Sequence, residues 1–127
     1  MILDELTEKV IGACFEVSNE LGCGFLESVY GKALLIVLRE KGLNACSQVP
    51  LQVLFRQQVV GDFFADVVVE EQVLVELKAV KSLAPEHVAQ VLNYLRGTNI
   101  QVGLLVNFGN PKLEIRRFEN KVRTIKS

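Results

Sequence analysis

Three charged side chains lie inside two strongly apolar runs of the sequence. Asp66 interrupts a run of Phe, Ala and Val between residues 63 and 69. Glu76 and Lys78 interrupt a second run, of Val, Leu and Ala, between residues 73 and 80. Strands that are apolar at nearly every position are usually covered on both faces, and a buried charge without a partner is unfavourable. These three side chains are therefore the first candidates for chemistry.

The spacing of the three charges predicts that they share one site. Side chains two apart project from the same face of a strand, so Glu76 and Lys78 form a pair. If residues 70–72 form a hairpin loop, Asp66 falls opposite Glu76, with the two Cβ atoms roughly 4.5 to 5.5 Å apart. Two carboxylates at that range repel, and a hard divalent cation relieves the repulsion. We therefore expect an Mg²⁺ or Mn²⁺ site. The alternative is a buried Asp-Glu-Lys network that neutralises itself.

The periodicity of apolar residues predicts the elements that position these side chains. The expected elements, in order, are helices over residues 3–21 and about 26–41, strands over 49–55, 59–69 and 73–80, a helix from Pro85 to Gly97, and strands over 102–108 and 113–118. Pro50 places the first strand at an edge of the sheet. In the third helix, Val88, Leu92 and Leu95 are expected to face the core. The order predicts an α/β (α+β) fold with a mixed β-sheet flanked by helices.

The composition is typical of one packed globular domain over residues 1–127. Half of the residues are hydrophobic and 23% are charged. No stretch has the length and apolarity of a membrane span, and residues 1–8 lack a signal-peptide pattern, so we expect a cytoplasmic protein without membrane contact. Three cysteines without a CxxC spacing argue against a disulfide framework and against structural zinc.

Positive charge is concentrated near the C-terminus. The net charge of the chain is −1, yet residues 112–127 contain six Lys or Arg residues and only two Glu residues. Because basic side chains neutralise phosphates, we expect four of them to contact nucleic acid: Arg116, Arg117, Lys121 and Arg123. The alternative is a solvated edge strand and tail.

Two motifs resemble those of a known nuclease superfamily. Asp66 followed by Glu76-Leu77-Lys78 resembles the D…(D/E)xK signature of the PD-(D/E)XK nucleases, with Ala65 in place of the proline. Gly24 to Tyr30 match the pattern G-x-x-E-x-x-Y, and the chain around them resembles the small bacterial and archaeal GxxExxY proteins. The resemblance extends over nearly the whole chain, and it implies a restriction-endonuclease-like PD-(D/E)XK core.

The resemblance also implies roles for five side chains. It implies that Glu27, Asp66 and Glu76 bind the metal, that Lys78 acts on the nucleophilic water, and that Gln90 assists the reaction.

Two of these assignments have support from the residues themselves. Glu27 is a carboxylate on the helix face that is expected to pack against the sheet, where it has no structural use. Gln90 shares a helix face with His87 and Tyr94, and this face is rotated away from the expected packing stripe. For His87, an exposed or locally bonded residue is the simpler interpretation than a proton shuttle.

These features favour an Mg²⁺-dependent nuclease that hydrolyses phosphodiester bonds of DNA or RNA. The alternative function is a non-catalytic scaffold that keeps the nuclease fold and binds nucleic acid or protein. The sequence contains no separate recognition domain and no aromatic-rich basic surface. A nuclease of this size would therefore bind weakly, act as a homo-oligomer or depend on a partner protein.

Overall fold

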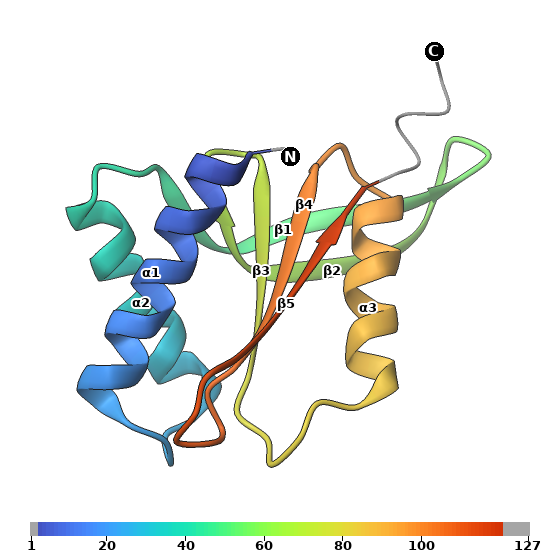
Figure 1. Ribbon diagram of the computed structural model, residues 1–127. Coiled ribbons are helices and arrows are strands. Elements are labelled where there is room, and N and C mark those ends of the chain that lie inside the picture. The colour runs from blue at the N-terminus through green and yellow to red at the C-terminus, as the bar shows by residue number, and fades with distance from the viewer. Residues whose placement is uncertain (1–2, 121–127) are drawn as a thin grey trace.

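The computed structural model describes residues 3–120, which contain three helices and five strands in the expected order (Figure 1). The elements are α1 (Asp4–Leu21), α2 (Glu27–Glu40), β1 (Ala45–Phe55), β2 (Gln58–Val69), β3 (Val73–Lys78), α3 (Pro85–Arg96), β4 (Val102–Asn107) and β5 (Glu114–Glu119). They form a mixed sheet flanked by helices, so the expected α+β class is confirmed. None of these three helices combines the length and apolarity needed to cross a lipid bilayer.

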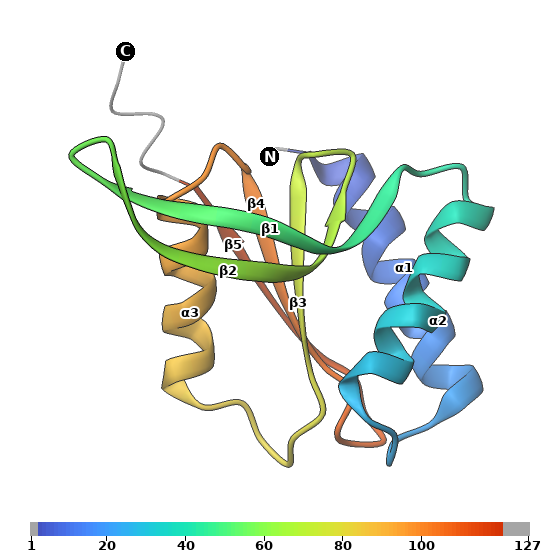
Figure 2. The same cartoon turned by 180° about the vertical axis from the view of Figure 1, so that it is seen from behind.

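The five strands of residues 3–120 form one sheet in the order β1-β2-β3-β4-β5. Neighbouring strands are antiparallel except for β3 and β4, which are parallel. Parallel neighbours need a crossover connection, and α3 provides it. The helices α1 and α2 cover one face of the sheet and α3 covers the other (Figures 1 and 2). The central strands β3 and β4 are therefore buried on both faces.

The helix α3 packs on the sheet through Val91 and Leu95, which are both buried. Leu92 was expected to face the core, but it is 36% exposed, so that prediction was wrong. Gly103 of β4 explains the difference, because a Cβ added there would lie only 2.8 Å from Cγ1 of Val91. The helix thus approaches the sheet most closely at Val91. The apolar spacing predicted the helix but not its rotation about its own axis.

The strand β1 begins at Ala45, four residues before the expected start at Val49. The cause is Gln48, whose φ of 50° lies in the left-handed region. A non-glycine residue in that region is uncommon, and it interrupts the alternation of side chains along the strand. The two-residue period is therefore visible only from Val49 onward. The position of β1 at an edge of the sheet agrees with the expectation from Pro50.

A buried tyrosine fixes the turn between α1 and α2. The hydroxyl of Tyr30 donates a hydrogen bond to the carbonyl of Gly22 over 2.6 Å, and its ring stacks on Phe108 with the centroids 4.5 Å apart. Gly24 has a φ of 110°, which side chains with a Cβ rarely adopt. The glycine and the tyrosine of the G-x-x-E-x-x-Y pattern therefore determine where α2 begins. Its first residue is Glu27.

We predict that Tyr30→Phe destabilises the protein by about 1–3 kcal/mol, because it removes a partner from two backbone groups. These groups are the carbonyl of Gly22 and the N–H of Phe25, which donates to the same hydroxyl over 3.3 Å. The matched control is Tyr94→Phe, at the other of the two tyrosines of the chain, which is only half-buried. Urea unfolding measures both variants, and equal losses of stability would contradict the role of Tyr30 in the turn.

Candidate active site

The hairpin between β2 and β3 sets the register that brings the acidic residues together. The turn over residues 69–72 has positive φ angles at both central residues, 53° and 57°. This geometry matches the twist of the flanking strands. The two strands then pair over residues 67–69 and 73–75. The next residues outward from the turn are Asp66 on β2 and Glu76 on β3.

Beyond this ladder, the next hydrogen bonds between the two strands are accepted by the carboxylates of Asp66 and Glu76 and not by backbone carbonyls. The Oε1 atom of Glu76 accepts a hydrogen bond from the backbone N–H of Asp66 over 3.3 Å. The Oδ2 atom of Asp66 accepts one from the backbone N–H of Leu77 over 2.8 Å. Each carboxylate thus contacts the backbone of the opposite strand. The hairpin spacing predicted that these side chains would be neighbours on adjacent strands, and the structure places them there.

Burial and electrostatic repulsion both change the pKa of Glu76, which is only 4% exposed. Burial raises the pKa of its carboxyl group, and the charge of Asp66 raises it further, to about 8. The N–H of Asp66 and the charge of Lys78 oppose this rise, while Glu27 adds to it. Without a cation, Glu76 therefore holds a proton at neutral pH. A bound cation would displace that proton.

Glu27 and Asp66 line the same cavity. This cavity, of about 360 Å³, opens between α2, β1 and β2, and its lining includes Lys32 and Gln48. Glu27 is exposed rather than packed against the sheet. Within residues 3–120, no three His, Cys, Asp or Glu side chains come together closely enough to hold one metal ion. Asp66 and Glu76 therefore lie side by side. Glu27 lines the cavity next to Asp66 but is too far away to form a three-carboxylate site with them.

Lys78 is the last residue of β3, and the segment after it is held by Asn107 of β4. The Oδ1 atom of Asn107 accepts hydrogen bonds from the N–H groups of Val80 and Gly109, each over 3.0 Å. Its Nδ2 atom donates to the carbonyl of Val80 over 2.9 Å. A Cβ on Gly109 would lie 2.1 Å from the carbonyl oxygen of Val80, so only glycine fits there. These contacts fix the end of β3 that carries Lys78.

Sequence reasoning gave no role to Asn107, although a signal was present. The residue ends a strand that is buried at all six positions, and its own side chain is fully buried. A buried amide must find hydrogen-bond partners. An Asn at the end of a wholly apolar strand therefore indicates a side chain that binds neighbouring backbone.

Gln90 lies on α3 and contacts Tyr94 of the same helix. Its Nε2 atom donates a hydrogen bond to the hydroxyl of Tyr94, and the ring of Tyr94 stacks on Phe63 of β2 with the centroids 3.6 Å apart. Burial raises the pKa of the Tyr94 hydroxyl, and the charge of Glu76 raises it further, which places this tyrosine within electrostatic reach of the site. The shared face of Gln90 and Tyr94, predicted from their spacing, thus borders the site.

His87 does not belong to this group. Its Nδ1 atom accepts a hydrogen bond from the backbone N–H of Ala84 over 3.0 Å, at the first turn of α3. This is the locally bonded histidine that was the simpler interpretation of the sequence.

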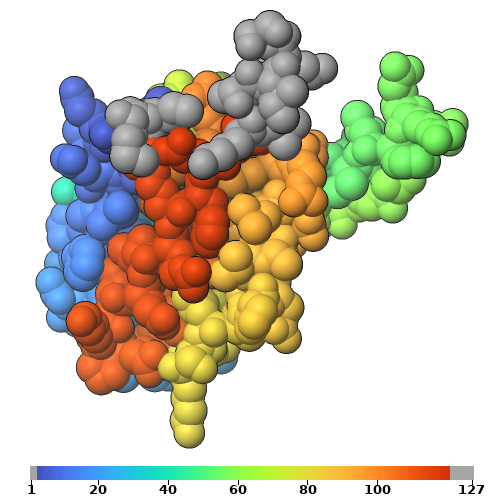
Figure 3. All heavy atoms as spheres, turned by 45° about the vertical axis from the view of Figure 1, so that its right-hand side comes forward, coloured from blue at the N-terminus to red at the C-terminus, as the bar shows by residue number. Residues whose placement is uncertain are grey.

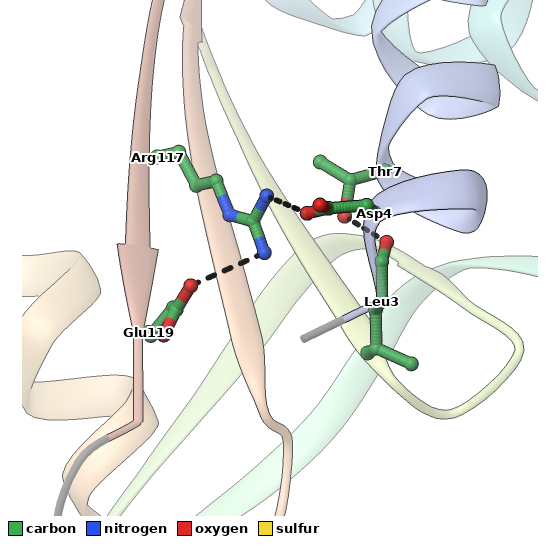
Figure 4. Close-up of polar contacts among 5 residues, drawn as sticks. All are labelled: Leu3, Asp4, Thr7, Arg117 and Glu119. Atoms are coloured by element: carbon green, nitrogen blue, oxygen red, sulfur yellow. Dashed lines mark hydrogen bonds and ion pairs between the residues drawn. The ribbon is translucent and has the colours of Figure 1, made fainter. Parts of the chain in front are cut away.

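The four basic residues proposed from the sequence do not form one surface in the part that is described. Arg116 and Arg117 are consecutive residues of β5, so their side chains project from opposite faces. Arg117 forms ion pairs with Asp4 of α1 over 3.0 Å and with Glu119 over 3.3 Å (Figure 4). Lys121 and Arg123 lie outside the described residues. The structure thus shows Arg117 as a link between β5 and α1.

The residues at the site suit a hard divalent cation. Asp66 and Glu76 offer carboxylate oxygens, and Mg²⁺ commonly binds through one or two carboxylates while it keeps several waters. Lys78 lowers the pKa of Glu76, but burial and the charge of Asp66 together raise it more.

We predict that the metal-free protein loses stability as the pH rises from about 5 to about 8.5. The pKa of Glu76 is raised in the folded chain from its usual 4.5 to about 8. The folded state therefore binds more protons than the unfolded state within this window, and the stabilisation that is complete below pH 4.5 is lost above 8. Urea unfolding in EDTA should show the decline in the wild type and a smaller one in Glu76→Gln. The same decline in both would assign it to other groups.

The chain is similar to one protein family and to solved structures that share its fold. Residues 4–118 match the family described as the PD-(D/E)XK nuclease superfamily. No curated protein sequence matches the chain. Two solved structures share its fold: an alkaline exonuclease (LHK-Exo) from Laribacter hongkongensis, with a TM-score of 0.51 and 15% identity, and the protein SSO0001, with a TM-score of 0.55 and 16% identity.

The similarity to these structures concerns the fold alone, because the identities are low. It covers 72% of this chain and 54% of the exonuclease, and 80% of this chain and 59% of SSO0001. The chain thus spans little more than half the length of either protein. The family match covers most of the chain, from α1 to β5, and includes the hairpin with Asp66, Glu76 and Lys78. The chain therefore belongs to the PD-(D/E)XK nuclease superfamily.

Proposed function

We propose that this protein is a nuclease that uses Mg²⁺ or Mn²⁺ to hydrolyse phosphodiester bonds of DNA or RNA. The observation that carries the proposal is the pair of carboxylates, Asp66 and Glu76, at the point where β2 and β3 separate, with Lys78 two residues further along β3. Superfamily membership supports it. Nucleic acid is accordingly the proposed partner.

Each side chain has a distinct task in this proposal. Asp66 and Glu76 hold the cation, which lowers the pKa of a bound water and neutralises charge on the phosphate when it is present. Lys78 places an ammonium group on the face of β3 that carries Glu76, where it orients the nucleophilic water and stabilises developing negative charge. Glu27 acts from the cavity side, and Gln90, oriented by Tyr94, contacts the substrate from α3.

We also assign the chain to the GxxExxY proteins within the superfamily. The pattern is supported by the use of its three residues in this fold. Gly24 and Tyr30 shape the turn before α2, and Glu27 follows as the first residue of that helix, at the cavity shared with Asp66.

We predict that Lys78→Ala lowers cleavage at least about 100-fold and leaves metal binding largely intact, because an ammonium group is not a metal ligand. Glu76→Gln should weaken both, because it removes a carboxylate ligand. Mn²⁺ calorimetry at a pH above the pKa of Glu76 separates the two variants, whereas a cleavage assay does not. The substrates should include single-stranded and duplex DNA and RNA.

Lys81→Ala is the matched control, since it removes an exposed lysine three residues further along the chain. Lys81→Ala should retain both metal binding and cleavage. A wild-type protein that binds Mn²⁺ but cleaves none of these substrates would support the non-catalytic scaffold. Cleavage that persists in Lys78→Ala and Glu76→Gln alike would come from a contaminating enzyme.

A further inference from the structure

The ribbon formed by β1 and β2 extends beyond the rest of the sheet. The two strands pair with each other from residues 45 and 69 out to residues 55 and 58, whereas β2 pairs with β3 only over residues 67–69. The outer part of the ribbon projects from the body of the molecule as an arm (Figure 3). One face of the ribbon packs toward α3, where Phe63 stacks on Tyr94. The inner end of the opposite face packs on α2, whereas further out, at Phe64, this face is exposed.

Phe64 lies on this opposite face, beside the proposed metal ligand. Its side chain is 60% exposed, and its partner across the ladder, Pro50, is exposed too. Asp66 follows two residues later on β2, about 6.5 to 7 Å further along the strand. Phe64 alternates with Phe63, so its ring faces away from α3. An aromatic ring that the core does not use therefore lies two residues from Asp66 on the same strand.

The cavity on the α2 side of Asp66 provides a positive charge. Lys32 lines it five residues beyond Glu27 on α2, and Gln48 of β1 lines it from the other side. Gln48 lies between the ladder pairs Ser47–Val67 and Val49–Ala65 and has a φ of 50°. Strained residues of this kind are concentrated at binding and catalytic sites. The cavity thus combines one cation, Lys32, and one amide with the carboxylates of Glu27 and Asp66.

We propose that Phe64 and this cavity form a subsite for a single strand of nucleic acid, in which the ring of Phe64 stacks on an unpaired base and Lys32 binds a neighbouring phosphate. The inference rests on the proposed nuclease function and adds the class of substrate to it. Proteins bind single strands by stacking bases on exposed aromatic rings and by pairing backbone phosphates with basic side chains. Bases inside a duplex are stacked on one another, and presenting one to the ring requires unpairing it. Single-stranded or locally unpaired nucleic acid is therefore the preferred substrate.

The tip of the arm, residues 54–60, differs from the surface around Phe64 in its exposed side chains. Its exposed side chains include the aliphatic Leu54, Val59 and Val60 and two glutamines, with Phe55 beside Arg56. Phe55 is 60% exposed, the same fraction as Phe64, but it lies at the far end of the ribbon from Asp66. It therefore provides a matched control for removal of an exposed phenyl ring.

Binding of a labelled oligonucleotide tests the subsite separately from cleavage. In a Lys78→Ala background with Mn²⁺, Phe64→Ala should weaken binding of a single-stranded probe by roughly 5- to 150-fold. Phe64→Trp should retain the affinity because its ring can stack, whereas Phe64→Leu should lose it. Phe55→Ala should bind like the parent protein. Binding of a blunt duplex should change little in any of these variants.

The salt dependence of binding tests Lys32. Lys32→Gln should reduce the slope of log affinity against log salt by about 0.7, the value for one phosphate contact on a single strand, and Phe64→Ala should leave the slope unchanged. Equal losses in Phe64→Ala and Phe55→Ala, or full affinity in Phe64→Leu, would overturn the subsite. So would a wild-type dimer in light scattering that Phe64→Ala converts to a monomer, since the ring would then contact a second copy of the chain.

The outcomes for cleavage and for binding are distinguishable. A wild-type protein that cuts nothing but loses single-strand affinity in Phe64→Ala would retain the subsite and reject the nuclease. A protein that cuts nucleic acid equally well in the wild type and Phe64→Ala would retain the nuclease and reject the subsite.

Discussion

The two hydrogen bonds that Asp66 and Glu76 accept from the backbone across the hairpin are the constraint on which the rest of this site depends. Each carboxylate accepts a hydrogen bond from the backbone of the opposite strand, at the point where the ladder between β2 and β3 ends. The two acidic groups are thereby held side by side in a largely buried position. The charged state of Glu76 is unfavourable there, and its raised pKa records this cost. In the proposed function, a divalent cation stabilises the charges of both carboxylates.

Contacts on three sides of this pair fix the elements that surround it. On the α2 side, Tyr30 fixes the turn that places Glu27 at the start of the helix. At the end of β3, Asn107 binds the backbone that follows Lys78. On the α3 side, Tyr94 stacks on Phe63 of β2. In the proposed function, groups that act on one phosphate need fixed relative positions. The contacts of Asn107 and Tyr94 are between segments distant in the sequence.

The sequence alone predicted the elements and singled out the central residues of the candidate site, for a physical reason. Apolar periodicity reports which face of an element is buried, and a charge inside an apolar strand conflicts with that pattern. Asp66, Glu76 and Lys78 were found through this conflict. Hairpin length and strand alternation then sufficed to place Asp66 next to Glu76.

The features that the sequence did not predict depend on tertiary contacts. The rotation of α3, which exposes Leu92, depends on the close approach permitted by Gly103 on another element. The left-handed Gln48 leaves no compositional signal, because glutamine is not a residue that usually adopts a positive φ. The basic pattern at the end of the chain predicted a binding surface, but it could not reveal that Arg117 pairs with Asp4, more than 100 residues earlier.

The position of a bound metal ion tests the central claim most directly. Crystals of the wild-type protein soaked in Mn²⁺ would be measured for anomalous scattering at the manganese edge. An anomalous peak at coordination distance from the carboxylates of both Asp66 and Glu76 is the predicted result. A fully occupied peak elsewhere, or a map without a peak in which Lys78 bonds directly to both carboxylates, would show instead that the three charges form a self-neutralised network.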